Sequence, residues 1–342
     1  MTRTLIVHRA GPGLSIQDTG RPGYLGFGLS RGGAADRLAL AEGAALLGQD
    51  ESHAALEMAG MGGEFEAGCD LRIALTGAPM RVSIDGARAA WNASHSLPAG
   101  ARLSIGGVEA GCFGYLHLGG GIETPLLLGA RAAHLSSGLG QTVAAGARLP
   151  VGTDPKAGET GLTLAVEPRF EGGVIRVVPS LQTDLFDPAE RDRFMATTFH
   201  RDARGSRMGV RLNSKVPGFH SEAGLSVLSE VVVPGDIQIT GDGTPFVLLG
   251  ECQTTGGYPR IASVLPCDLP RVVQAPPGAA LTFRLVELDE AVAAERRADE
   301  HRRGLRANLR PLVRDLHDIR DLLSYQLISG VTAGDDIERG RT

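Results

Sequence analysis

The amino-acid sequence predicts a mainly β protein built from two related β-barrel domains and a helical C-terminal tail. Three observations favour this fold class. Glycine is abundant, with 48 of 342 residues, whereas aromatic residues make up only 4%. Short apolar and β-branched runs recur from residue 4 to residue 286, and most are bounded by Gly, Pro or Asp, as expected for strands joined by tight turns. The two halves of this region also resemble each other.

The internal resemblance keeps a nearly constant offset. The segment from Ala99 to Gly129 parallels the segment from Pro234 to Val264, and AAGARLPV, which ends at Val151, matches PPGAALTF, which ends at Phe283. A duplicated β unit explains such an offset, although glycine-rich strand–turn units can also look alike by chance. We therefore expect a first β-barrel domain and a duplicate of it.

The expected domain boundaries follow from changes in composition. A polar Pro/Gly segment at 154–161 separates a first domain over residues 1–155 from a second over 165–287. Residues 288–342 form a tail that begins with a charged helical stretch, DEAVAAERRADEHRRGL. An amphipathic helix is then predicted from an apolar stripe, made of Leu312, Leu316, Ile319 and Leu323.

Few helices are predicted before the tail. Asp36 is a suitable N-cap for a helix that runs to Leu47, and Gly48 is a suitable stop, since Asp favours helix starts and Gly the left-handed residue at helix ends. Asp187 caps a second helix whose first residue is Pro188.

Composition excludes several classes of function. The net charge of −5 and the absence of a basic stripe argue against nucleic acid as a partner. No apolar run reaches signal-peptide or transmembrane length, and the four cysteines include no C-x-x-C pair, so neither a zinc site nor a disulfide framework is predicted. We expect a cytoplasmic protein with reduced thiols, no membrane contact and no metal.

The most informative segment is ECQTTGGYPRIASVLPCDLPR, from Glu251 to Arg271, which lies between apolar β-like runs. Gly256 and Gly257 are expected to allow positive φ and a close approach of the backbone to a ligand. The hydroxyls of Thr254 and Thr255 can hold a carboxylate, carbamate or amide oxygen. The segment predicts a ligand-binding loop carried by two strands; the alternative is a tight turn whose glycines serve geometry alone.

A second polar cluster lies between Ile16 and Asp36 and contains Gln17, Asp18 and Arg21. It forms either a pocket wall in which Arg21 recognises an anion, or an ordered loop in which Asp18 and Arg21 pair locally.

A third cluster, RGSRMGVRL, holds Arg207 and Arg211. Strand alternation would direct both side chains to one face, where guanidinium groups suit carboxylates and phosphates. The alternative is two solvated arginines on an edge strand. No G-x-S-x-G, H-E-x-x-H or Walker A motif occurs, so any ATP would bind by other means or on another polypeptide.

Together these clusters resemble the allophanate hydrolase subunit 2 family, also called KipA-like. The resemblance covers roughly residues 3–286, and QTTGGYP is its most specific part, followed by QDTGRPG. The family includes the C subunit of bacterial 5-oxoprolinase and part of the carboxyltransferase region of urea carboxylase. The resemblance implies two cyclophilin-like β-barrel domains and a partner from the sister family, allophanate hydrolase subunit 1 or KipI-like.

Carried over residue by residue, the resemblance implies a pocket in which Thr255 and Tyr258 are catalytic and Asp268 is a base or orienting acceptor. The implied substrate-binding residues are Gln253, Thr254, Gly256, Gly257, Arg260, Gln17, Asp18, Arg21, Arg207 and Arg211. This chain has Arg260 where the family often has a small residue or Lys, and SRGGAAD where PSGAMD is commoner, so the substrate stays open.

Three functions remain open at this stage. The leading one is the C subunit of a 5-oxoprolinase-like complex, in which a LamB/YcsF-type partner takes part in the ATP-dependent opening of 5-oxoproline to L-glutamate. The second is the carboxyltransferase part of a biotin-dependent enzyme, which uses carboxybiotin on a separate carrier. The third is a KipA-like regulatory protein that binds a kinase-inhibitor partner without catalysis.

Overall fold

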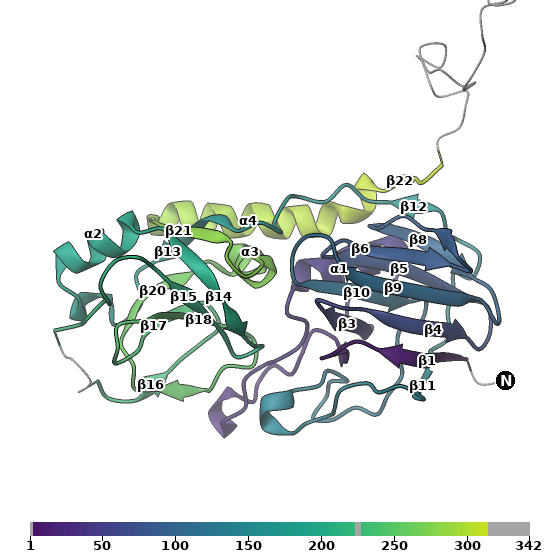
Figure 1. Cartoon of the computed structure of the whole chain (residues 1–342), viewed down its shortest axis with the longest axis horizontal. Helices are drawn as coiled ribbons and strands as arrows, with labels where there is room; N and C mark the ends of the chain where they lie inside the picture. The colour runs from purple at the N-terminus through teal and green to yellow at the C-terminus, as the bar shows by residue number, and fades with distance from the viewer. Residues whose placement is uncertain (1–2, 223–226, 314–342) are drawn as a thin grey trace, which may run out of the picture.

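The computed structural model describes residues 3–222 and 227–313 and confirms the mainly β fold class. Two β domains lie side by side, and a long helix runs across both of them (Figure 1). Among the described residues, none of the helices combines the length and apolar character that a membrane span needs.

The first domain consists of two antiparallel sheets that enclose one apolar core. The first sheet has the order β11 (Arg148–Pro150), β1 (Thr4–Ala10), β4 (Gly63–Ala67), β9 (Arg102–Val108), β6 (Met80–Ile84) and β7 (Ala87–Arg88). The second sheet has the order β2 (Ser15–Gln17), β3 (Ala55–Ala59), β10 (Phe113–Leu118), β5 (Leu71–Gly77), β8 (Ala93–Leu97), β12 (Leu162–Thr163) and β22 (Arg310–Pro311).

Helix α1 (Arg37–Leu47) explains why β5 is buried on both faces. β4 alternates buried and more exposed residues, as a strand with one covered face should. β5 is buried at every position, because the core lies on one side and α1 packs on the other. The predicted caps of this helix are confirmed: the Asp36 side chain accepts a hydrogen bond from Ala39 N, and Gly48 takes the left-handed conformation.

The second domain is a closed seven-stranded barrel. Its strand order is β13 (Gly173–Val178), β20 (Arg260–Val264), β17 (Asp236–Ile239), β18 (Pro245–Leu248), β15 (Gly209–Asn213), β14 (Phe199–Gly205) and β21 (Ala280–Leu285). A parallel pair, β13 and β21, closes it. Next to the barrel, β16 (Glu230–Val231) pairs with β19 (Thr255–Gly256). The core contains a cluster of four phenylalanine rings, Phe194, Phe199, Phe219 and Phe283.

The remaining elements are short helices and one long one. Asp187 caps α2 (Pro188–Ala196) as predicted, by accepting a hydrogen bond from Ala189 N. The others are α3 (Leu269–Gln274), α4 (Leu288–Gly304) and the 3-10 helices η1 (Leu25–Phe27), η2 (Leu135–Ser137), η3 (Thr183–Leu185), η4 (Pro266–Asp268) and η5 (Leu305–Asn308).

The charged stretch of the tail is helical, as predicted, and corresponds to α4. The helix runs from the barrel back to the first domain (Figure 1), where β22 pairs with β12. The amphipathic helix predicted around Leu316, Ile319 and Leu323 lies outside the described residues.

Buried polar side chains join the two domains. Gln274 of α3 is fully buried; its amide nitrogen donates to Asp36 Oδ2 and Phe113 O, each at 2.9 Å, and its oxygen accepts from the backbone of Cys112 and Phe113. Every hydrogen-bonding group of this amide is therefore used, which fixes α3 against the first domain.

Candidate functional site

A cavity of about 520 Å³ lies on the outer face of the barrel, over β15, β18 and β17. Val247 and Ile237 belong to the barrel core, so strand alternation turns their neighbours Phe246, Leu248 and Gln238 outward into the cavity. The full lining is Arg204, Gly205, Ser206, Met208, Gly209, Gln238, Thr240, Phe246, Leu248, Gln253 and Tyr258.

Two of the predicted site residues, Gln253 and Tyr258, line this cavity. Tyr258 is 44% exposed, so its hydroxyl is accessible to a ligand or a partner. Gln253 Nε2 donates to Gln238 Oε1 at 3.1 Å. Two residues of the segment thus contribute to the cavity wall, and a ligand-binding role for the segment stays a prediction.

Gln238 carries a hydrogen-bond donor without a partner. Its side chain is 3% exposed, its oxygen accepts from Gln253, and its Nε2 group is buried with no partner among the described residues. A buried donor left unpaired costs about 1–3 kcal/mol. The nitrogen is packed against Gly256, so the amide belongs to the wall of the cavity and holds Gln253 in place. Sequence reasoning missed this residue, because a Gln between two inward isoleucines of a strand is also the pattern of an ordinary solvent-facing residue.

The glycines of the motif act by close approach and not by positive φ. Neither Gly256 nor Gly257 has a left-handed φ; that expectation was wrong. A Cβ on Gly256 would lie 2.5 Å from Gln238 Nε2, whereas the nearest atom to a Cβ on Gly257 is Ser229 Oγ at 3.2 Å. Because Gly256 has no side chain, there is room beside it for the Gln238 amide.

The two threonines do not line the cavity. Thr255 lies in β19 opposite Val231 of β16, and Thr254 O accepts a hydrogen bond from Val232 N at 3.0 Å. Thr255 is exposed. Both residues pair the motif with residues 230–232, so the structure gives them a role in holding the wall of the cavity.

Arg260 supports the paired strands β16 and β19. It is 4% exposed, and its guanidinium donates to Val231 O at 2.8 Å and Glu230 Oε2 at 2.7 Å, both in β16. It also bonds Asp236 Oδ2 and Gln182 Oε1, each at 3.2 Å. With these partners the side chain positions β16 and, through it, β19.

Asp268 lies apart from this cavity. Its carboxylate accepts from Arg176 N, Nε and Nη2 at 2.8, 2.9 and 2.6 Å. It lines a different cavity, against α4, which shares no lining residue with the first. The structure therefore does not bring Asp268 together with Tyr258.

The N-terminal cluster anchors a loop of the first domain. Arg21 is 1% exposed and donates to the carbonyl oxygens of Leu127 and Ala132. Asp18 accepts from Gly20 N and Arg131 N. Gln17 Nε2 donates to Ser15 Oγ and Ala133 O. The three side chains hold residues 127–133 in place, and none lines the cavity.

Arg207 and Arg211 do not share a strand face. Arg207 precedes β15 and reaches the domain interface, where it pairs with Glu57 and Glu251 and donates to Gly33 O. Arg211 lies within β15 beside Thr244. Because Glu251 begins the motif and also accepts from Ser136 N, Arg207 fixes the cavity wall to the first domain.

A serine, a histidine and a carboxylate lie in triad-like order at this interface. His134 Nε2 is 2.9 Å from Ser30 Oγ, and its Nδ1 is 4.0 Å from Glu251 Oε2. All three are at most 3% exposed, and no described cavity includes them. Burial lowers the pKa of His134. Because a substrate cannot reach Ser30, this arrangement stabilises the interface.

The cavity offers donors and an apolar floor but no general base. Its lining contains no Asp, Glu or His, and the neighbouring Cys252 thiol has its pKa raised to about 12 by burial. No group of three or more His, Cys, Asp or Glu residues positioned for a metal occurs in the described ranges. The site can bind and orient an oxygen-rich ligand, but proton transfer needs another source.

Comparison with known sequences decides the family. The model of the family described as "Carboxyltransferase domain, subdomain A and B" matches residues 27–285, more than half of the chain. The chain belongs to this family.

Relatives of this carboxyltransferase family member are parts of enzymes. It is 33% identical to the 5-oxoprolinase C subunit of Escherichia coli (strain K12), over 87% of this chain and 96% of that protein. Identity to the 5-oxoprolinase C subunit of Haemophilus influenzae is 29%, over 83% and 91%. Identity to urea amidolyase of Saccharomyces cerevisiae is 26%, over 79% of this chain but 16% of that protein.

Solved structures share the fold. The crystal structure of TTHA0988 has a TM-score of 0.75 at 28% identity, over 83% of this carboxyltransferase family member and 56% of that chain. The urea amidolyase of K. lactis has a TM-score of 0.79 at 24% identity, over 89% of this chain and 20% of that chain. Because its identity to the urea amidolyase is only 24%, that similarity supports the shared fold alone. This chain thus spans little more than half of one solved relative and a fifth of the other.

Proposed function

We propose that this chain is the C subunit of a 5-oxoprolinase-like complex, which opens 5-oxoproline to L-glutamate with ATP, together with the A and B subunits. The observation that carries the proposal is the extent of the match. The chain spans 96% and 91% of two bacterial 5-oxoprolinase C subunits, at 33% and 29% identity. The match to urea amidolyase covers only 16% of that protein.

The cavity over β15, β18 and β17 supports a small lactam as ligand. A lactam carbonyl is an acceptor for the exposed donors of the lining, the Gln253 amide and the Tyr258 hydroxyl, and its ring methylenes suit the apolar floor of Met208, Phe246 and Leu248. The guanidinium of Arg204, at the rim, already pairs with Asp202 through hydrogen bonds of 3.0 and 2.9 Å, so the substrate carboxylate would have to bind its remaining N–H groups or a donor of a partner subunit. Preorganised donors of this kind stabilise the oxyanion that develops when an amide carbonyl is attacked.

The missing base supports a shared active site. Opening an unstrained lactam needs an activated carbonyl and a proton acceptor, and the cavity lining contains neither a carboxylate nor an imidazole. We place the phosphoryl donor, ATP, on another polypeptide of the complex. The partners proposed here are a member of the allophanate hydrolase subunit 1 or KipI-like family and a LamB/YcsF-type protein, and Tyr258 is one of the exposed lining residues that would face them.

The decisive experiment is reconstitution. The chain is combined with candidate A and B subunits, and ATP-dependent glutamate formation from 5-oxoproline is measured with and without it. Turnover that requires all three components supports the proposal. A fully assembled complex that leaves 5-oxoproline unchanged contradicts it.

A carboxyltransferase function is the second candidate, favoured by the family description and by the urea amidolyase match. In that case the same donors would hold the carboxyl group delivered by carboxybiotin on a separate carrier. Biotin-dependent carboxylation of urea by the chain and a biotinylated carrier would support it. Tight assembly with the sister-family partner and neither activity would favour the KipA-like regulatory function.

A further inference from the structure

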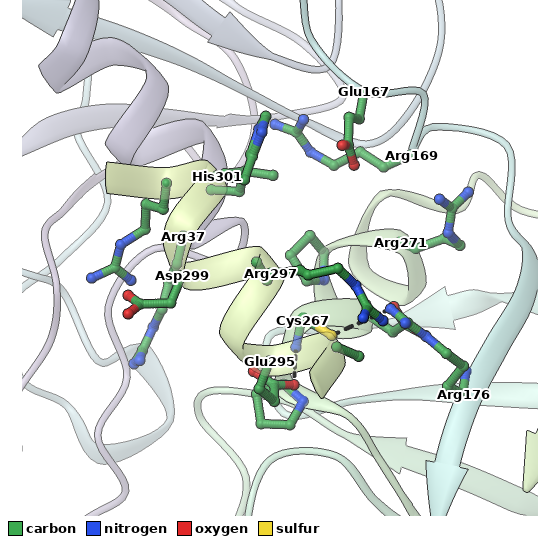
Figure 2. Close-up of a pocket in the computed structure, with 17 residues that line it drawn as sticks. Arg37, Glu167, Arg169, Arg176, Cys267, Arg271, Glu295, Arg297, Asp299 and His301 are labelled. Carbon is green, nitrogen blue, oxygen red and sulfur yellow. Dashed lines mark hydrogen bonds and ion pairs between the residues drawn. The ribbon is translucent and has the colours of Figure 1, made fainter. Parts of the chain in front are cut away.

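A second cavity, of about 530 Å³, lies where the two domains and α4 meet. Its walls come from α1, the segment at 167–169, β13, the η4–α3 turn and α4 (Figure 2). Six of its lining residues are arginines: Arg37, Arg169, Arg176, Arg271, Arg297 and Arg302. A ligand here would contact both domains and the helix that connects them.

Three of these arginines already have acidic partners. Arg169 pairs with Asp36 at 2.8 Å and with Glu42 at 2.7 Å. Arg176 pairs with Asp268 at 2.6 Å. Arg302 pairs with Glu51 at 3.3 Å. Their charges are neutralised within the chain, so they define the walls and do not provide the surplus charge of the cavity.

The other three arginines have no carboxylate partner among the described residues. Arg37 donates to Gly32 O at 3.3 Å, and Arg271 donates to Gly172 O at 3.2 Å. Arg297, on α4, has no hydrogen bond or ion pair in the described part of the chain. Each guanidinium keeps most of its five donors for a ligand.

The acids that line the cavity offset much of this charge. Asp299 pairs with Arg303 at 2.6 Å, and Asp268 is used by Arg176. Glu295 Oε1 accepts from Cys267 N, a backbone contact that leaves its negative charge in place, and Glu167 also has no arginine partner among the described residues. Three unpaired arginines against these two glutamates leave a surplus of at most about one positive charge. Consistently, burial and repulsion from Arg31 and Arg302 lower the pKa of Arg37 to about 10.

The lining also defines the kind of anion. It contains no Phe, Tyr or Trp, so it lacks a surface on which a nucleobase could stack. Forked guanidinium donors from three different elements suit the oxygens of a phosphoryl group. The volume lies within the range of small-molecule sites, about 300–1,000 Å³. The Cys267 thiol has its pKa raised to about 12 by burial, so it is not a nucleophile here.

We propose that Arg37, Arg271 and Arg297 bind a compact phosphate-bearing anion, which joins the two domains to α4. This site is separate from the cavity of the proposed function and needs no turnover to be occupied. A ligand that bridges three elements stabilises their folded arrangement, because it binds the native state and not the unfolded chain.

Tripolyphosphate is the probe that tests this site. Its binding to the full chain is measured by calorimetry and by the shift in Tm, in EDTA and at low ionic strength. We expect a rise in Tm, a Kd that weakens with salt, and a loss of affinity of about tenfold or more in Arg297→Ala and in Arg271→Ala, since a charge-assisted hydrogen bond contributes that much.

Arg296→Ala is the matched control, because Arg296 is an exposed neighbour on α4 that does not line the cavity. Its Kd should change less than about twofold. Arg297 is exposed and makes no hydrogen bond to the described residues, so the Tm of the ligand-free Arg297→Ala variant should equal that of the wild type. Equal weakening in Arg296→Ala and Arg297→Ala would show non-specific attraction and overturn the proposal, as would a wild-type chain that does not bind.

Two comparator ligands test the chemical class. Citrate carries a similar charge on carboxylates, and ATP carries the same triphosphate with a base. We expect tripolyphosphate to bind more tightly than citrate and at least as tightly as ATP. If citrate binds as tightly as tripolyphosphate or more tightly, the assignment of a phosphate-bearing ligand is overturned. If ATP binds much more tightly, the inference that the anion is compact is overturned. None of these outcomes depends on 5-oxoproline turnover, so failure here is distinct from failure of the proposed function.

Discussion

Gln238 Nε2 and Gly256 lie so close that a Cβ at position 256 would be 2.5 Å from that nitrogen. The contact explains why a glycine is needed in a segment whose φ angles any residue could adopt. It also connects the motif at 251–258 to β17, on which Gln238 is carried. The position of the Gln238 amide in the cavity wall thus depends on the absence of a side chain at position 256.

Gly256→Ala should lower turnover strongly. The added methyl would displace the Gln238 amide and with it the Gln253 side chain, which donates to Gln238 Oε1. Loss of a preorganised donor to a developing oxyanion costs on the order of 10²-fold in kcat. The measurement is kcat in the reconstituted complex, with Gly257→Ala as the control, because a Cβ there comes no closer than 3.2 Å to Ser229 Oγ and 3.5 Å to Val227 O. Equal activity in the two variants would show that the Gln238 position is irrelevant.

Tyr258→Phe and Thr255→Ala should differ. The sequence resemblance assigned both residues to catalysis, but only Tyr258 lines the cavity, and Thr255 lies in β19. We expect the first variant to lower kcat/KM by about tenfold or more, the usual contribution of a positioned hydrogen-bonding group, and the second to stay within about threefold. A larger loss of kcat/KM in Thr255→Ala, with partner binding intact, would show that the Thr255 hydroxyl takes part in the reaction.

The sequence located the motif but not its partners. Alternating runs on both sides placed the loop between two strands, which are β18 and β20, and the caps at Asp36 and Gly48 defined α1. Local patterns of this kind are visible because strand and helix periods act over a few residues.

The roles of the arginines could not be predicted in the same way. Arg207 pairs with Glu57, 150 positions away in the chain, and Asp268 pairs with Arg176, 92 positions away. Nothing in the local sequence distinguishes an arginine that will be paired across the fold from one that will bind an anion. The cavity on the outer face of β17 and β18 was missed because a single outward Gln in a strand resembles an ordinary solvent-facing residue.

Arg207→Ala should destabilise the fold. It would leave Glu57 and Glu251, exposed by 1% and 2%, buried without their cation. Breaking a buried pair by removing one partner costs about 3–5 kcal/mol, and urea denaturation measures this loss. Arg211→Ala is the control, with an expected cost below about 1 kcal/mol, because its described hydrogen bond is a 3.5 Å contact to Thr244. A loss of activity at unchanged stability would contradict the structural role of Arg207.

His117 should make the fold sensitive to acid. Thr76 Oγ1 donates its proton to Ala39 O, so it accepts from His117 Nε2, 2.8 Å away, and the imidazole is neutral. Burial lowers the pKa of His117 from 6.5 to about 3. The unfolded chain therefore binds a proton between these values that the folded chain does not. The stabilisation is complete above pH 6.5 and is lost as the pH falls towards 3.

His117→Gln should remove this part of the pH dependence. Between about pH 7 and about pH 4.5 the free energy of unfolding of the wild type should fall by about 2–3 kcal/mol more than that of the variant. The measurement is urea denaturation at both pH values, and the exposed His220 provides the control, His220→Gln. An identical slope in the wild type and His117→Gln would mean that the imidazole titrates normally in the fold.

Leu305 tests whether the end of α4 stabilises the first domain. It is 2% exposed and packs in a cluster with α1 and Leu164, immediately before β22 pairs with β12. Leu305→Ala should cost about 2–4 kcal/mol, from lost burial and the cavity that remains. Leu288→Ala, at the 72% exposed start of α4, the helix that ends where η5 begins with Leu305, should cost below about 0.5 kcal/mol. Thermal unfolding of both variants measures the difference. Equal Tm values would show that the end of α4 does not stabilise the first domain. A large loss of turnover in Leu305→Ala at wild-type stability would instead show that the C-terminal segment takes part in catalysis.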